Sequence, residues 1–133
     1  IMAITGAQID EDTSQLAVCL ETILGCAGSA RNVQALLDKG MTATQILAEG
    51  ISDARILELS GVSLDAILYY VNQDIPVLAS FNDNSAVLVI GFNEQNIVVM
   101  DPKTGTIYKK GMNDSAQWFE ENGNQFVTYV YEK

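Results

Sequence analysis

The side chains that could support nucleophilic catalysis in this chain are two cysteines, Cys19 and Cys26, and several serines, and the sequence contains no histidine. A catalytic thiol or hydroxyl needs a base that titrates near neutral pH, and imidazole is the only side chain whose unperturbed pKa lies there. No Ser-x-x-Lys motif supplies the lysine alternative. The residues of this chain alone therefore lack the base of a conventional cysteine or serine hydrolase.

The two cysteines also lack the spacing for a disulfide or a metal site. They lie seven residues apart in a stretch with helical periodicity, which corresponds to about 10 Å of rise along a helix. This exceeds the Cα separation that a disulfide permits. Two cysteines without a histidine also make a poor zinc site. We expect free, mostly buried thiols, and neither a metal nor a cofactor.

Acidic side chains are frequent, and one group of them partly imitates a calcium loop. Asp10, Asp12, Ser14 and Glu21 occupy the first, third, fifth and twelfth positions of such a loop. The sixth position is Gln15, where calcium loops need glycine for a sharp turn. Acidic and hydroxyl side chains at a helix N-terminus explain the same pattern better. The sequence therefore favours helix capping here.

Composition places the chain among globular domains and excludes two classes of partner. Its 133 residues are 48% hydrophobic and 18% charged, which fits one packed domain covering residues 1–133. The net charge of −10 argues against nucleic-acid binding and against docking on an anionic membrane. No apolar run approaches the roughly 20 residues of a membrane span. Because the chain begins at Ile1 without a signal-peptide pattern, we expect a domain excised from a longer chain.

The first half of the sequence has mainly helical periodicity. A group of capping residues at 10–14 precedes apolar positions spaced for a helix over 16–24, which ends near Gly25 or Gly28. Ser63 is placed to cap a later helix. The other predicted elements are helices over 31–39, 42–48 and 64–71, and an edge strand over 55–59.

The second half changes to the short apolar runs of strands. The run 86–92 is apolar throughout, which is typical of a central strand buried on both faces. Asn113 is placed to cap a helix over 114–121. The other predicted strands are 76–81, 97–100, 106–109 and 125–131. Helices followed by antiparallel strands predict an α+β fold.

Two of these runs carry the most informative motif. Residues 85–92 read Ser-Ala-Val-Leu-Val-Ile-Gly-Phe, and residues 97–102 read Ile-Val-Val-Met-Asp-Pro. With the flanking helix and strands, their order and spacing resemble the papain-like double-glycine leader peptidases, the bacteriocin-processing or C39-like family. The region 63–131 carries the better match, and the first helix matches less well. The resemblance implies a papain-like α+β fold in which N-terminal helices pack on an antiparallel sheet.

Two of the family's catalytic positions fall within the better-matching region, 63–131. In the family, a histidine opens the central strand, and an Asp or Asn on the next strand orients it. The histidine position falls at Ser85, and the orienting acid falls at Asp101. The resemblance therefore implies that the orienting acid is retained and that the base is replaced.

The nucleophile position can be assigned in two ways. In the family, a cysteine at the N-terminus of the first helix is the nucleophile, and an upstream glutamine helps form the oxyanion hole. The nucleophile position falls at Glu11 if Leu16-Ala17 sets the register, or at Ser14 if Gln8 is the oxyanion glutamine. Neither residue is a cysteine. In both registers Cys19 lies about two turns inside the helix, as a core residue.

The resemblance thus implies a degenerate peptidase that lacks the catalytic cysteine and histidine. Its vestigial cleft would consist of Gln8, Glu11, Ser14, Ser85 and Asp101. Losing the base alone costs on the order of 10⁴-fold in related triads. We expect a non-catalytic, peptidase-like module of a larger bacterial protein that binds a peptide or a neighbouring domain in the cleft, or that has a structural role.

A hydrolase with altered chemistry is the alternative. Its base would come from another chain or domain, or the carboxylates of Glu11 and Asp101 would act as a pair. The resemblance alone implies that the parent protein is exported or attached to a membrane.

Overall fold

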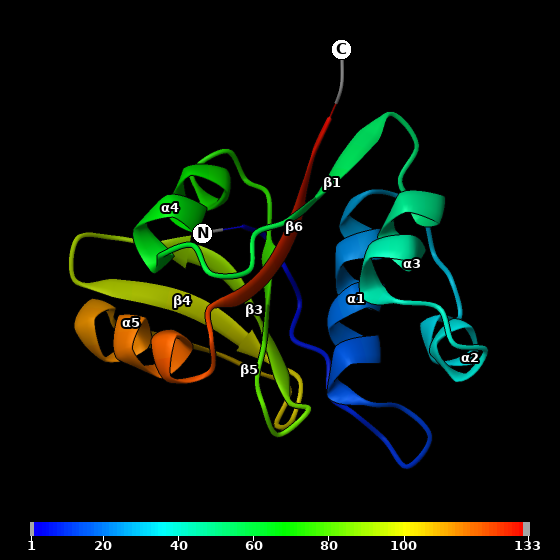
Figure 1. Ribbon diagram of the computed structural model, residues 1–133. Helices are drawn as coiled ribbons and strands as arrows, with labels where there is room; N and C mark the ends of the chain where they lie inside the picture. Colours follow the sequence, from blue (N-terminus) through cyan, green and yellow to red (C-terminus); the bar gives the residue numbers. More distant parts are fainter. Residues whose placement is uncertain (1, 132–133) are drawn as a thin grey trace.

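The computed structural model describes residues 2–131 and has a six-stranded antiparallel sheet at its centre (Figure 1). The spatial order is β1-β6-β2-β3-β4-β5. The strands are β1 (Ala54–Glu58), β2 (Val77–Ser80), β3 (Ala86–Phe92), β4 (Asn96–Asp101), β5 (Thr106–Gly111) and β6 (Gln125–Tyr131). The predicted α+β fold is confirmed.

Helices cover both faces of this sheet, so the molecule has three layers (Figure 1). One face carries α1 (Gln15–Cys26), α2 (Val33–Asp38) and α3 (Ala43–Gly50). The other face carries α4 (Leu64–Val71) and α5 (Met112–Glu121). The prediction that N-terminal helices pack on an antiparallel sheet is confirmed, and the structure adds a second core beneath α4 and α5.

Strand β3 lies in the middle of the molecule, as its continuous apolar run predicts. Its residues from Ala86 to Gly91 are buried. Because successive side chains of a strand point to opposite faces, Leu88 packs in the core beneath α1, whereas Val87 and Val89 pack in the core beneath α4 and α5. The pairing of β3 with β4 shifts register between Val89 and Gly91.

Four of the helices begin at a polar side chain that accepts a hydrogen bond from the first turn. These caps are Ser14 for α1, Asn32 for α2, Thr42 for α3 and Ser63 for α4. Helix α5 differs, and the prediction that Asn113 caps it is wrong. The helix starts at Met112 directly after β5, because Gly111 is its N-cap and no side chain caps it.

Other predicted boundaries differ by one or two residues. Helix α2, for example, is predicted over 31–39 and is limited to Val33–Asp38, because Asn32 caps it. Helix α3 extends two residues beyond the predicted end and finishes at Gly50. A Cβ at Gly50 would lie 2.5 Å from Cδ2 of the buried Leu24. The absence of a side chain at Gly50 therefore lets α3 approach α1 closely.

The segment before α1 lies against the sheet near the turn between β4 and β5. Met2 N–H donates to Ile90 O at 3.1 Å, and Ile9 N–H donates to Pro102 O at 2.9 Å. Between them, a Cβ at Gly6 would lie only 2.2 Å from Gly105 O. Only a residue without a side chain fits at Gly6, and the N-terminal segment is thereby held beside the start of β5.

Candidate functional site

The N-terminus of α1 meets the start of β3, although the two lie far apart in the sequence. Gln15 Oε1 accepts a hydrogen bond from Ala86 N–H at 3.3 Å. Ser14, immediately before, caps α1, because its Oγ accepts from Ala17 N–H at 3.1 Å. Ser14 N–H donates in turn to Gln34 Oε1 of α2 at 2.8 Å. The start of the helix is therefore fixed both to the sheet and to its neighbouring helix.

A pocket of about 290 Å³ lies at this junction, and we call it the Ser14–Ser85 pocket. It brings together the first turn of α1, the end of β2, the start of β3 and the start of β6. Its lining residues are Ser14, Leu16, Ser80, Phe81, Asn84, Ser85, Ala86 and Gln125. The lining offers hydroxyl and amide groups beside apolar carbon, but no side chain that titrates near neutral pH.

Ser85 has a carboxylate partner within its own turn. Asp83 Oδ1 accepts hydrogen bonds from Ser85 Oγ at 2.5 Å and from Ser85 N–H at 3.0 Å. The hydroxyl of Ser85 is the largest cause that lowers the pKa of the exposed Asp83 below its ordinary value. A carboxylate with a lowered pKa is a poor proton acceptor at neutral pH. The Ser85–Asp83 pair therefore fixes the turn and does not supply the missing base.

Ser14 and Glu11 are the two candidates for the nucleophile position, and they occupy different environments. Ser14 is at the helix N-terminus, where the backbone dipole stabilises a nearby anion. Glu11 is exposed in the turn that precedes the helix. Ser14 lines the Ser14–Ser85 pocket, whereas Glu11 does not.

Gln8 lines a second hollow, between the segment before α1 and the first half of that helix. Its Nε2 donates to Lys103 O at 3.5 Å. The hollow also contains the side chains of Asp10, Thr13, Glu21 and others. Among residues 2–131, no group of three or more acidic, cysteine or histidine side chains is placed to hold a metal ion.

Asp101 accepts hydrogen bonds from backbone groups of the turn that follows it. Its Oδ1 accepts from Lys103 N–H at 2.9 Å, and its carbonyl oxygen accepts from Gly105 N–H at 2.8 Å. Among the described residues, no hydrogen bond joins Asp101 to Ser85. The predicted cleft set is therefore only partly assembled: Ser14 and Ser85 share one pocket, whereas Gln8, Glu11 and Asp101 do not line it.

The two thiols lie in contrasting environments, and the prediction that both are mostly buried is wrong for one of them. Cys19 is fully buried, and burial, followed by the charge of Asp101, raises its pKa strongly. Cys26 is exposed at the end of α1, although partial burial also raises its pKa. A thiol with a raised pKa carries little thiolate at neutral pH. Neither cysteine has the environment of a catalytic nucleophile.

Sequence reasoning missed a group of amides that holds one wall of the pocket. Gln125 Nε2 donates to Asn82 Oδ1 at 3.0 Å and to Asn122 O at 2.8 Å. Asn122 Oδ1 accepts from Asn82 N–H at 3.1 Å. The turn before β3 is thereby tied to the loop before β6. The Asn and Gln residues at the ends of the predicted elements were the available signal, but which of them pair depends on the order of the strands in the sheet.

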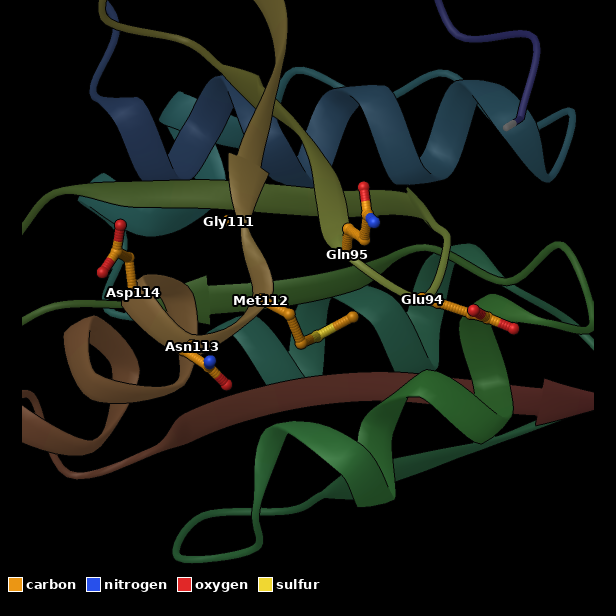
Figure 2. A pocket seen from close by; sticks show the side chains of 6 residues that line it. All are labelled: Glu94, Gln95, Gly111, Met112, Asn113 and Asp114. Carbon is orange, nitrogen blue, oxygen red and sulfur yellow. The ribbon is translucent and has the colours of Figure 1, made fainter.

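Another hollow lies where the turn after β3 meets the junction of β5 and α5, and Figure 2 shows its lining. Met112 N–H donates there to Gln95 O at 2.8 Å. The side chains do not converge: Glu94 and Asp114 lie at opposite sides of the hollow and point away from each other (Figure 2). The two carboxylates therefore do not form a paired site.

Comparison with solved structures gives a consistent result for the fold. A Bacillus anthracis protein described as a C39-like peptidase superposes with a TM-score of 0.81 at 14% identity, over 98% of this chain and 96% of that one. The chain has the fold of a C39-like peptidase. No family model matches the sequence, and no curated protein sequence matches it either.

Two further structures with the C39-like fold are domains of larger bacterial proteins. One is the N-terminal peptidase C39-like domain of a toxin secretion ATP-binding protein from Vibrio parahaemolyticus, with a TM-score of 0.62 and 15% identity over 91% of this chain and 98% of that one. The other is the peptidase domain of Streptococcus ComA, a bifunctional ABC transporter involved in quorum sensing, with a TM-score of 0.55 and 14% identity over 98% of each chain. In the described part of this chain, no helix has both the length and the apolar character to cross a membrane.

Proposed function

We propose that this C39-like domain is a non-catalytic module that binds an extended peptide or partner segment in the Ser14–Ser85 pocket. The lining of that pocket is the observation that carries the proposal. Serines stand at both places where the resemblance puts the nucleophile and the base, and no other lining residue supplies a thiol or an imidazole. Peptide hydrolysis by the triad mechanism needs a thiol or hydroxyl that a neighbouring imidazole activates, and this lining has no imidazole.

The chemistry of the pocket suits a peptide backbone. Ser14, Ser80 and Gln125 offer hydrogen-bonding groups, and Leu16 and Phe81 offer apolar contact. A few placed polar groups among apolar ones are typical of binding sites. Because no lining side chain is charged, we expect an uncharged segment to bind. The double-glycine peptides of the resembled family are one such class.

The proposed setting is that of one domain, residues 1–133, in a larger exported or membrane-attached bacterial protein. The domains from Vibrio parahaemolyticus and Streptococcus support this proposal, because each is part of a larger transport protein. The bound segment would then belong to a neighbouring domain or to a peptide handled by the parent protein.

The test uses a Gly-Gly-containing peptide, Ac-Leu-Ser-Gly-Gly-Ala-NH₂, added to the ¹⁵N-labelled domain. We expect amide shifts at Ser80, Ser85 and Gln125, and no cleavage by mass spectrometry after prolonged incubation. Ser80→Phe fills the pocket and should abolish the shifts, whereas Ser52→Phe, at an exposed position outside the pocket, should not. Cleavage that is lost in Ser14→Ala would establish the hydrolase alternative. Absence of shifts in the pocket would leave only a structural role.

A further inference from the structure

Among residues 2–131, strand β5 is the outermost strand of the sheet on one side and pairs with β4 alone. The hydrogen bond from Met112 N–H to Gln95 O continues the register that pairs Lys110 with Ile97. In an antiparallel ladder, hydrogen-bonded pairs recur at every second residue. Tyr108 and Lys110 therefore direct their backbone groups toward β4. The backbone groups of Ile107, Lys109 and Gly111 point away from the sheet.

The side chains of this strand are exposed on both faces of the sheet. The exposed fraction is 40% for Ile107 and 36% for Tyr108, and Thr106 and Lys109 are exposed as well. By contrast, the middle of β4 is buried. The N-terminal segment reaches only the start of β5, where a Cβ at Gly6 would lie 3.9 Å from Ile107 Cγ1. Among residues 2–131, the outer edge of the strand is therefore uncovered from Ile107 onward, and its faces are exposed up to Lys109, before Lys110 packs on α5.

The segment 102–113, which contains β5, is positively charged, whereas the whole chain is negatively charged. The chain has a net charge of −10, yet residues 102–113 contain three lysines and no acidic residue. Lys110 Nζ lies 4.7 Å from the ring centre of Trp118, on the α5 face. Lys109 alternates with it and lies on the α1 face. A ligand strand at this edge would therefore meet one lysine on each of its two faces.

We propose that the β5 edge binds an acidic, extended polypeptide segment as an additional strand of the sheet. Main-chain hydrogen bonds to Ile107, Lys109 and Gly111 would supply affinity, and side-chain pairing would supply selectivity. Acidic side chains would pair with Lys109 and Lys110, and apolar ones would pack beside Ile107 and Tyr108.

The charges argue against a second copy of this chain as the occupant. Two copies joined edge to edge would bring their lysine rows together, and each copy carries a net charge of −10. Like charges placed opposite each other destabilise a strand pair. Lysines on an edge strand oppose unselective pairing in the same way. An acidic strand would instead place carboxylates opposite the lysines of β5, and these opposite charges attract.

The test titrates the ¹⁵N-labelled domain with Ac-Thr-Glu-Glu-Val-Val-Thr-NH₂ and with its basic counterpart Ac-Thr-Lys-Lys-Val-Val-Thr-NH₂. In an antiparallel register, the adjacent Glu residues of the acidic peptide lie opposite Lys110 and Lys109, and its Val residues lie opposite Tyr108 and Ile107. For the acidic peptide we expect shifts and slowed hydrogen exchange at the amides of Ile107, Lys109 and Gly111, which are not bonded within the sheet. Binding should weaken as salt is raised, because exposed charge pairs are screened. The basic peptide should leave these amides unchanged.

Lys109→Glu should weaken binding of the acidic peptide roughly tenfold, since it replaces an attraction with a repulsion. Lys39→Glu makes the same change in net charge at an exposed position after α2 and should have little effect. Four results would overturn the proposal: equal binding of both peptides, no change at the edge amides, shifts confined to the Ser14–Ser85 pocket, or edge shifts that follow protein concentration without peptide. The last would identify a second copy as the occupant.

Discussion

Replacing Ser14 with cysteine and Ser85 with histidine should rebuild an activated thiol in the Ser14–Ser85 pocket. The thiol would then lie at the N-terminus of the 12-residue α1. The imidazole would project from the start of β3 into the same pocket. The double variant Ser14→Cys/Ser85→His in a Cys26→Ser background leaves only one other thiol, the buried Cys19. The reactivity of the new thiol therefore reports on the geometry of the pocket.

The expected size of the pKa change follows from two contributions. A helix N-terminus stabilises an exposed anion by about 0.3–1 kcal/mol, which lowers a thiol pKa by roughly half a unit from its usual value of about 8.5. A neighbouring imidazolium lowers it by about 1–3 units more. The thiol of the double variant should therefore titrate at roughly pH 5–7. Because nucleophilicity falls with pKa, the midpoint of the pH–rate curve is a better measure than the rate at one pH.

The assay is the rate of iodoacetamide alkylation between pH 4 and pH 10. Ser14→Cys alone should show only the small shift due to the helix. A matched control places the thiol at the exposed N-cap of α4, as Ser63→Cys, where Ser85→His should change nothing. Thermal unfolding monitors the loss of the serine cap, which costs about 0.5–2 kcal/mol. If adding Ser85→His to Ser14→Cys leaves the midpoint unchanged, the two positions do not form the vestigial pair and the reasoning fails.

Three further predictions concern other parts of the molecule. Native Cys19 should resist alkylation at all pH values up to unfolding, because it is buried and its pKa is raised; mass spectrometry of labelled peptides checks this, and rapid labelling of the folded protein would contradict it. Gly6→Ala should detach the N-terminal segment, since its Cβ would overlap the Gly105 carbonyl; faster hydrogen exchange of segment 2–9 with little change in the rest of the sheet is the expected result. Asp83→Asn should destabilise the protein at neutral pH. The folded-state pKa of Asp83 is lowered, so its stabilising contribution is present above the unfolded pKa and is lost as pH falls through the folded value. Denaturant unfolding at several pH values should show the difference from wild type shrinking in acid, and a constant difference would refute the role of the charge.

The sequence predicted the elements whose physical cause is local. The continuous apolar run of β3 indicates a strand buried on both faces. The helical spacing of Leu16 and Leu20 indicates a helix buried on one face. Both patterns can be read from the residues alone. Ser14 and Ser63 cap helices because a hydroxyl satisfies free N–H groups at any helix start. Asn113 failed as a cap because β5 continues without a break into α5, and no local pattern indicates that continuity.

Contacts between elements that are distant in the sequence could not be predicted from local patterns. The contact of Gln15 with Ala86 and that of Asn82 with Asn122 depend on which strands become neighbours. The exposure of Cys26 likewise depends on how the end of α1 packs, whereas Cys19 lies on the buried face of the helix. The sequence also left Ser14 and Glu11 as equal candidates, because the choice rests on where the helix begins.

The place of β6 between β1 and β2 has a consequence for how this chain folds. Strands β2 to β5 follow one another in both sequence and space, so they can assemble as a meander of short-range contacts. In the part of the chain that the structure describes, strand β1 pairs only with β6, joining Ala54 to Tyr131. It therefore has no partner until nearly the whole described chain has been synthesised. Because distant pairing slows folding, we expect insertion of β6 to be the late, rate-limiting event. Until then, β1 and the outer edge of β2 present open strand edges to other chains.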